Sequence, residues 1–295
     1  MKSNYRYIVK AFMAMAVIAG TTSCDDFLDR EPMSSISPET YYSTAAQLEA
    51  NLNDEYPNVL PSFGQWTYGI FGEDKGTDNQ IEVNANDRYT QDRWKVPHSE
   101  SDNWKFERIY RINFFLSEAL PKFGEDMSGS QNTISGSVAT IKHYIGEMYF
   151  LRAYEYFKKL QLFGDFPIIN QPLADEMEAL REASKRFPRN EVARFIISDL
   201  DKAYAYMSDV DMATTRINKD VAMLVKSRVA LFEATWLQNF KGTAFVPGGE
   251  GWPGASLHNN YQYPSGNIDN EVKYFLEQAV EASKLVADKY KGSLT

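Results

Sequence analysis

The 295-residue sequence contains a single cysteine, Cys24, and only three histidines. One cysteine excludes an intramolecular disulfide and any zinc site built from several thiolates. The histidines, His98, His143 and His258, are too scattered along the chain to suggest a metal cluster. We therefore expect no cofactor and no metal site built from cysteine or histidine; the sequence does not decide whether calcium, which binds through oxygen, is required.

Basic residues are also scarce. Lysine and arginine number 31 against 40 aspartates and glutamates, which gives a formal net charge of -9. The first 23 residues hold three of the basic residues and no acid, so the rest of the chain carries 28 against 40, a charge of -12. Because binding to phosphates needs surplus Lys and Arg, this balance argues against a nucleic-acid-binding protein. Fractions of 43% hydrophobic and 24% charged residues are typical of a folded globular protein.

No apolar run is long enough to span a bilayer, which takes about 20 residues. A basic start, the apolar residues 11–19 and a few small residues lead to Cys24, as in an export signal. Small residues directly before a cysteine resemble the cleavage site of bacterial lipoproteins. We therefore expect residues 1–23 to be a signal peptide, Cys24 to carry the lipid and residues 24–38 to form an acidic tether containing Pro and Ser. The alternative is an ordinary signal peptide followed by an incidental cysteine.

From residue 39 onward, the apolar residues follow the helical period, without sustained two-residue alternation. This pattern predicts an all-α fold in which successive helices stack as pairs. The predicted helices cover about residues 40–56, 102–120 and 137–163, and three more begin near Asn190, Asn218 and Asn270.

The third predicted helix is apolar around most of its circumference, which places it between other helices. Gly164 is expected to end it, and Pro57 is expected to stop the first helix. His143 and Glu147, four residues apart on the third helix, are interpreted as a helix contact and not as a ligand pair.

Two segments, residues 61–101 and 242–269, lack a sustained period and are rich in aromatic residues. Long irregular segments in a compact domain are often functional, and aromatic residues argue against disorder. Aromatic rings can cover the flat face of a sugar, while Asp, Asn, Gln and Arg can bond to its hydroxyls. On this chemistry, Arg88, Tyr89 and Arg93 are candidate ligand-binding residues. The alternative is that Trp66 and Trp94 are core aromatics that only pin this long first segment onto the helices.

Common catalytic motifs are missing from the sequence: GxSxG, HExxH and GxxxxGK[ST] do not occur. A glycosidase needs two carboxylates at a defined separation, which spacing along a sequence cannot show. Nothing in the sequence argues for catalysis, so we expect a protein that is not an enzyme.

Five motifs, in order along nearly the whole chain, resemble those of the SusD/RagB family of Bacteroidetes outer-membrane lipoproteins. They are SCDDFLD at 23–29, WKFERIYRIN at 104–113, RAYEYF at 152–157 continuing to LFGDFPI at 162–168, IISDLDKA at 196–203, and RINK at 216–219 leading to RVALF at 228–232.

The resemblance implies a fold of tetratricopeptide-like helix pairs and a protein that captures a nutrient, usually a glycan, at the cell surface. The implied partners are an oligo- or polysaccharide, a SusC-like TonB-dependent transporter, and the outer membrane, to which Cys24 would anchor a protein facing outward. The resemblance assigns ligand contacts to Asp78 and Trp94. Family members usually continue well beyond the sixth helix, so residues 39–295 are expected to lack the family's C-terminal portion.

Two other functions remain open. The chain could be a helical scaffold lipoprotein whose aromatic loops bind a protein partner, since protein interfaces also favour Tyr and Trp. It could also be a surface glycosidase.

Overall fold

The computed structural model describes residues 41–61, 80, 103–124, 126–208, 212–213 and 215–293. The chain divides into two units, Met1–Tyr41 and Tyr42–Thr295, and every helix described below belongs to the second. The predicted signal peptide and the tether lie outside the described residues, as does Cys24.

The described part of the chain is helical, as predicted, and isolated β-bridges join Thr44 to Ser135 and Phe166 to Phe187. Its elements are α4 (Ala45–Val59), α5 (Glu107–Phe123), α6 (Val138–Phe163), α7 (Met177–Ala183), α8 (Arg189–Tyr206), α9 (Lys219–Asn239), the 3-10 helix η2 (Pro253–Ser256) and α10 (Ile268–Tyr290).

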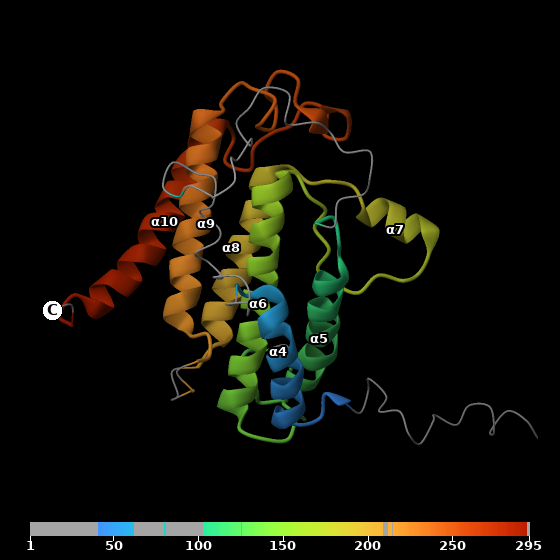
Figure 1. Ribbon diagram of the computed structural model, residues 1–295, viewed down its shortest axis with the longest axis vertical. Coiled ribbons are helices and arrows are strands. Elements are labelled where there is room, and N and C mark those ends of the chain that lie inside the picture. Colours follow the sequence, from blue (N-terminus) through green and yellow to red (C-terminus); the bar gives the residue numbers. More distant parts are fainter. Residues whose placement is uncertain are drawn as a thin grey trace, which may run out of the picture. The chain divides into compact units, whose positions relative to one another are not determined.

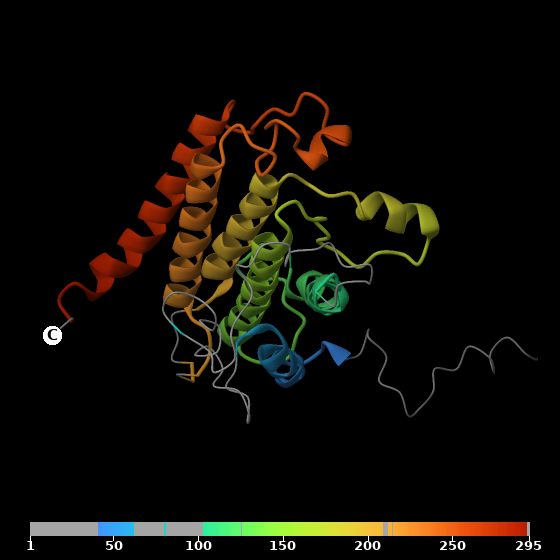
Figure 2. The same cartoon turned by 45° about the horizontal axis from the view of Figure 1, so that its top comes forward.

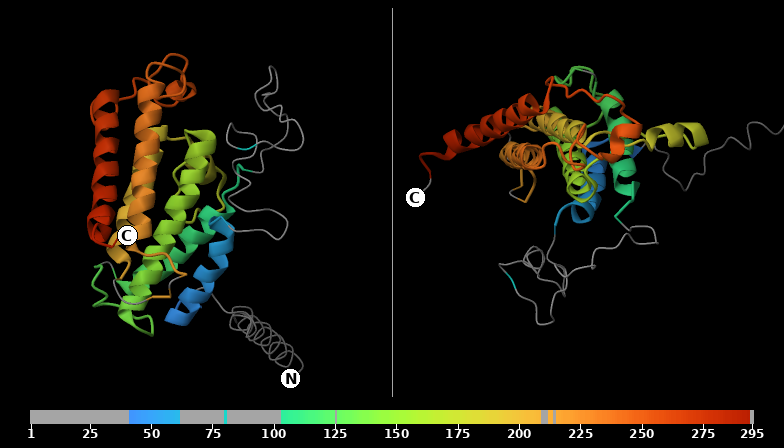
Figure 3. Two further views of the ribbon diagram at one scale, coloured as in Figure 1. Left: turned by 60° about the vertical axis from the view of Figure 1, so that its left-hand side comes forward. Right: turned by 90° about the horizontal axis from the view of Figure 1, so that it is seen from above.

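The helices stack side by side around α6 (Figure 1). Helix α6 contacts α4 and α5 on one side and α8 on the other; α9 then packs on α8, and α10 on α9. Figure 3 shows α10 at one edge of this stack and α4 near the opposite edge. The most extensive contacts are between α6 and α8 and between α9 and α10, so the predicted helix pairs are confirmed. Among the described helices, none combines the length and apolarity that a membrane span requires.

Helix α6 is the centre of the core. The hydroxyl of Ser137 caps its start by accepting the N–H of Thr140, at 3.4 Å. Gly164 ends the helix with a φ of +67°, a conformation that a residue without Cβ adopts at little cost. Its buried residues lie on all sides, as the apolar pattern predicted; they include Ile141, Ile145, Met148, Phe150, Leu151, Ala153, Tyr156 and Leu160.

The prediction that Pro57 stops the first helix is wrong, because α4 continues to Val59. A proline lacks the N–H that would bond to the carbonyl four residues before it, but near the end of a helix only that bond is lost. The N–H of Leu60 still bonds to the carbonyl of Tyr56 at 2.9 Å and closes the last turn. Helix α5 likewise runs past Pro121 and ends at Phe123.

The predicted starts of the last two helices are accurate to within a few residues. Asn218 is the N-cap of α9, and its side chain accepts the N–H of Val221 at 3.1 Å. Helix α10 starts at Ile268, because the cap is Asn267 and not Asn270. The side chain of Asn267 accepts the N–H of Asn270 at 2.9 Å.

Candidate functional site

All five predicted ligand-binding residues lie outside the described residues, so they stay predictions; they are Asp78, Arg88, Tyr89, Arg93 and Trp94. The second aromatic segment, residues 242–269, is described in full. It crosses one end of the helix stack as the loop between α9 and α10 (Figure 2).

A cleft of about 540 Å³ lies between this loop and the C-terminal end of α6; we call it the α6-end cleft. Its volume falls within the range of about 300–1,000 Å³ that is typical of small-molecule sites. The cleft is lined by residues 161–165, by Arg186 and Arg189 around the start of α8, by Trp236 of α9, and by residues of the α9–α10 loop that include Phe245, Trp252 and Leu257.

Asp165 connects three segments in this cleft. One carboxylate oxygen accepts the N–H of Arg189 at 2.9 Å, and the other accepts the indole N–H of Trp252 at 2.7 Å. Burial raises the pKa of Asp165 above its ordinary value, although both hydrogen bonds act in the opposite direction. The LFGDFP motif therefore ends α6 at Gly164 and uses its aspartate to hold both α8 and the loop.

The prediction of Asn190 as the N-cap of α8 is wrong. The cap position is held by Pro188, whose side chain makes no capping hydrogen bond. Asp165 bonds to the first helical N–H in its place, from a distant part of the chain. The amide of Asn190 instead donates to the carboxylate of Glu271 in α10, at 3.0 Å.

A short β-bridge closes the chain segment that leaves α6 and returns to α8. Phe166 and Phe187 exchange backbone hydrogen bonds of 3.2 and 3.1 Å. Trp104 packs edge-on against Phe166, with ring centroids 4.9 Å apart, and the guanidinium of Arg186 lies 4.5 Å from the Trp104 ring centroid. These contacts fix the exposed Arg186 at the cleft.

A buried ion pair forms the back of the cleft. Arg189 and Glu233 are 3% and 0% exposed, and the guanidinium donates three hydrogen bonds to the carboxylate, of 3.0, 3.2 and 2.9 Å. The same guanidinium lies 4.1 Å from the ring centroid of Trp236. The indole N–H of Trp236 in turn donates to the carbonyl of Phe245 at 3.1 Å, so the pair and the ring together position this part of the loop.

Several aromatic residues of the loop are structural. Trp252 is only 4% exposed and stacks on His258, with ring centroids 5.9 Å apart. Tyr261 shares hydrogen bonds with the side chain of Asn190, and the hydroxyl of Tyr263 donates to the carbonyl of Pro247 at 2.6 Å. These rings therefore hold the α9–α10 loop in place. The alternative that Trp66 and Trp94 pin the first segment concerns residues outside those described and stays a prediction.

The cleft also has an exposed apolar rim, formed by Leu162, Phe245 and Leu257, which are 58%, 61% and 53% exposed. Phe245 and Trp236 are possible ligand contacts that the sequence interpretation did not select. The only signal for Phe245 was the aromatic richness of residues 242–269, and Trp236 lies outside that segment, in α9. Chemically, the cleft offers an exposed ring and apolar side chains beside a carboxylate and a guanidinium.

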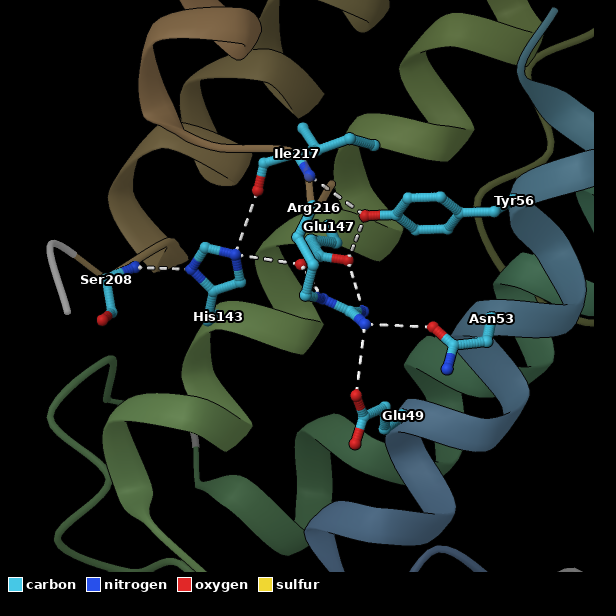
Figure 4. Close-up of polar contacts among 8 residues, drawn as sticks. All are labelled: Glu49, Asn53, Tyr56, His143, Glu147, Ser208, Arg216 and Ile217. Carbon is cyan, nitrogen blue, oxygen red and sulfur yellow. Dashed lines mark hydrogen bonds and ion pairs between the residues drawn. The ribbon is translucent and has the colours of Figure 1, made fainter. Parts of the chain in front are cut away.

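His143 and Glu147 belong to a second polar cluster, which is buried beneath α4 (Figure 4). The Nε2 of His143 lies 2.9 Å from Glu147 and 3.0 Å from the carbonyl of Ile217. Its Nδ1 accepts the N–H of Ser208 at 3.2 Å, which leaves the proton of the neutral ring on Nε2. The predicted helix contact is thus confirmed.

Glu147 also binds residues from outside α6. Arg216 donates two hydrogen bonds of 2.8 Å to its carboxylate, and the hydroxyl of Tyr56 donates another of 2.6 Å. The cluster therefore fastens α4 and the segment before α9 to α6. The described residues contain no group of three or more His, Cys, Asp or Glu arranged to hold a metal.

The observations define a class: an α-helical protein of stacked helix pairs with a ligand-sized cleft at one end of the stack. A family model described as SusD-like, "Starch-binding associating with outer membrane", matches residues 26–231. The chain belongs to this family of carbohydrate-binding proteins, whose members are associated with the outer membrane.

The chain is 25% identical over 253 residues to SusD-like protein P2 of Formosa agariphila, covering 82% of this chain and 46% of that protein. It is also 25% identical over 233 residues to SusD-like protein P25 of the same organism, covering 72% and 41%. Its fold is similar to the crystal structure of a SusD-like protein from Bacteroides fragilis, with a TM-score of 0.50 and 21% identity over 72% of this chain and 39% of that one. The chain thus spans less than half the length of these relatives.

Proposed function

We propose that this protein is a cell-surface lipoprotein that binds a glycan and passes it to a SusC-like TonB-dependent transporter, without bond chemistry of its own. The observation that carries the proposal is the match of residues 26–231 to a starch-binding, outer-membrane family. The α6-end cleft supports it, because an exposed aromatic ring beside a carboxylate and a guanidinium suits the C–H face and the hydroxyls of a sugar.

Asp78, Arg88, Tyr89, Arg93 and Trp94 are proposed to contact the glycan. Isothermal titration of the purified protein with a panel of neutral and acidic polysaccharides tests this binding. Trp94→Ala should weaken the binding and leave the helical circular dichroism unchanged. A loss of helicity in this variant would mean that Trp94 belongs to the core.

The proposed anchor is a lipid on Cys24, which follows the signal peptide of residues 1–23 and precedes the tether of residues 24–38. Each buried methylene of an acyl chain contributes about 0.8 kcal/mol, so several chains on one cysteine hold a protein firmly in the membrane. Cys24→Ala should move the protein from the membrane to the soluble fraction. Digestion of intact cells by an added protease tests the outward orientation, and a protected protein would contradict it.

The proposed partner is a transporter encoded beside this gene. Affinity purification of the tagged protein from detergent-solubilised outer membranes should recover this transporter with both the wild type and Trp94→Ala. If neither protein recovers the transporter from membranes that contain it, this part of the proposal is wrong.

A second function, a scaffold that binds a protein partner, is favoured by the apolar rim of Leu162, Phe245 and Leu257. Protein interfaces also bury such side chains. Absence of binding heat with every polysaccharide, together with retained binding to the transporter, would favour the scaffold. Release of reducing ends from a bound glycan would instead favour a glycosidase.

A further inference from the structure

We propose that the α6-end cleft is a subsite for a neutral stretch of the glycan, with one sugar ring stacked on Phe245. This inference rests on the proposed glycan binding, but it assigns the contact to residues other than the five between 78 and 94. Three features carry it: an exposed ring in a fixed position, polar groups with unused acceptor capacity, and a balance of charge within the cleft.

Phe245 is exposed but firmly placed. Its backbone carbonyl accepts the indole N–H of Trp236, and its N–H bonds to the hydroxyl of Thr243 at 3.3 Å. Its ring meets Phe240 edge-on, with centroids 5.4 Å apart, and the side chain is 61% exposed. A ring that is already ordered loses little conformational entropy on binding, which favours it as a stacking platform.

Asp165 can contact hydroxyls without giving up its structural role. Each of its oxygens accepts one hydrogen bond from the protein, at 2.9 and 2.7 Å. An ionised carboxylate has about four acceptor sites, so each oxygen retains one. The guanidinium of Arg186, held at the Trp104 ring, supplies donors in the same cleft.

The charges in the cleft balance in pairs. Arg189 is neutralised by the buried Glu233, and the positive Arg186 shares the cleft with the negative Asp165. A uronic or sulfated sugar would therefore gain no net attraction there. The hydroxyls of a neutral sugar can donate to the carboxylate and accept from the guanidinium. This balance selects neutral sugars as the ligand class.

Titration calorimetry with two neutral glycans, amylose-derived oligosaccharides and laminarin oligosaccharides, and one acidic glycan, oligogalacturonate, tests the inference. Phe245→Ala should raise the Kd for the bound neutral glycan roughly 5- to 20-fold. Phe245→Trp, which enlarges the stacking face, should keep or lower the Kd. Leu162→Ala should raise it by about two- to fivefold.

Two matched controls lie away from the cleft. Leu224→Ala changes a leucine of α9 that is as exposed as Leu162, at 51% against 58%. Tyr290→Ala removes an exposed ring whose hydroxyl bonds to Asp220, at the opposite end of α9 from Trp236. Both variants should bind like the wild type, and far-UV circular dichroism should report the same helicity for every variant.

The outcomes separate this inference from the proposed function. If Phe245→Ala binds like the wild type while Trp94→Ala loses affinity, the cleft is no subsite and the glycan-binding function stands. If the wild type binds only oligogalacturonate, the neutral class is wrong. If it binds none of the three glycans or the wider polysaccharide panel, the proposed function falls and this subsite falls with it.

Discussion

Asp165 shows how one side chain can hold several parts of this fold. Helix α8 begins at a proline cap that supplies no side-chain acceptor, and the indole N–H of the buried Trp252 needs an acceptor of its own. Asp165 supplies the acceptor for the first N–H of α8 and the acceptor for the Trp252 indole. A buried donor without a partner costs about 1–3 kcal/mol, and loss of a helix cap costs about 1 kcal/mol.

We therefore expect Asp165→Ala to lower the free energy of unfolding by about 2–4 kcal/mol, as measured by urea denaturation. Asp288→Ala, at an exposed position of α10, is the control and should change it by less than about 0.5 kcal/mol. Equal stability of the two variants would show that the contacts of Asp165 are not stabilising.

Glu271 is the residue that should link stability to acid. It is fully buried, and burial opposes its ionisation. Hydrogen bonds from Arg194, Asn190 and Ser265 outweigh burial, so its pKa lies below the ordinary value of 4.5. Because the folded pKa is the lower one, the stabilisation is complete above about pH 5 and is lost as the pH falls through the folded pKa.

Glu271→Gln should be less stable than the wild type at pH 7, by about 1–3 kcal/mol, because Arg194 loses its charged partner. The difference should shrink as the pH is lowered from 5 toward 3, and urea denaturation at each pH measures it. Glu277→Gln, on an exposed part of the same helix, should show no such trend. A constant difference for Glu271→Gln would contradict the lowered pKa.

At the scale of elements, the helices could be predicted because their apolar residues keep a 3.6-residue period and, for α9, because Asn218 caps its own helix. One error arises where a distant residue decides. The start of α8 depends on Asp165, which lies 24 residues away. Helix α4 continues past Pro57 because the proline removes only one backbone hydrogen bond, and the bond from Leu60 to Tyr56 still closes the last turn. The presence of a proline alone does not show whether the helix continues. The short helix α7 has no buried residues and therefore no apolar pattern to find.

The cluster around Glu147 joins elements that are far apart in the sequence. Removal of one partner of a buried ion pair leaves the other charge without compensation and typically costs 3–5 kcal/mol. We expect Glu147→Met to lower the free energy of unfolding by up to about this much, because the Arg216 side chain, 8% exposed, loses both hydrogen bonds to it and keeps only its bonds to Glu49 and the exposed Asn53.

The double variant Glu147→Met with Arg216→Met should lose less than Glu147→Met alone, since no buried charge is left behind. Chemical denaturation of the two single variants, the double variant and the wild type measures the coupling. Strictly additive losses would mean that the two side chains do not act as a pair.

At the scale of the whole molecule, the sequence predicted aromatic segments as places for a ligand but could not sort the rings within them. Trp252, Tyr261 and Phe245 lie in one segment and have similar chemistry. Trp252 and Tyr261 bond to partners on α6's exit and on α8, whereas Phe245 faces solvent. This division depends on contacts between residues more than 70 positions apart in the sequence, which cannot be predicted from the composition of the segment.

Two proposed sets of sugar contacts on one chain make glycan length the variable to test. If both residues 78–94 and the α6-end cleft bind one glycan, a longer oligosaccharide that reaches both sets gains affinity, because its second contact is intramolecular. We expect the Kd of the wild type to fall on the order of tenfold or more over a series of neutral oligosaccharides of increasing length. In Phe245→Ala this fall should be flattened, while the Kd for the shortest bound member changes least. Calorimetry over the series measures how the Kd depends on oligosaccharide length in the wild type and in Phe245→Ala. The same dependence in both would show that the cleft does not take part in binding the longer chains.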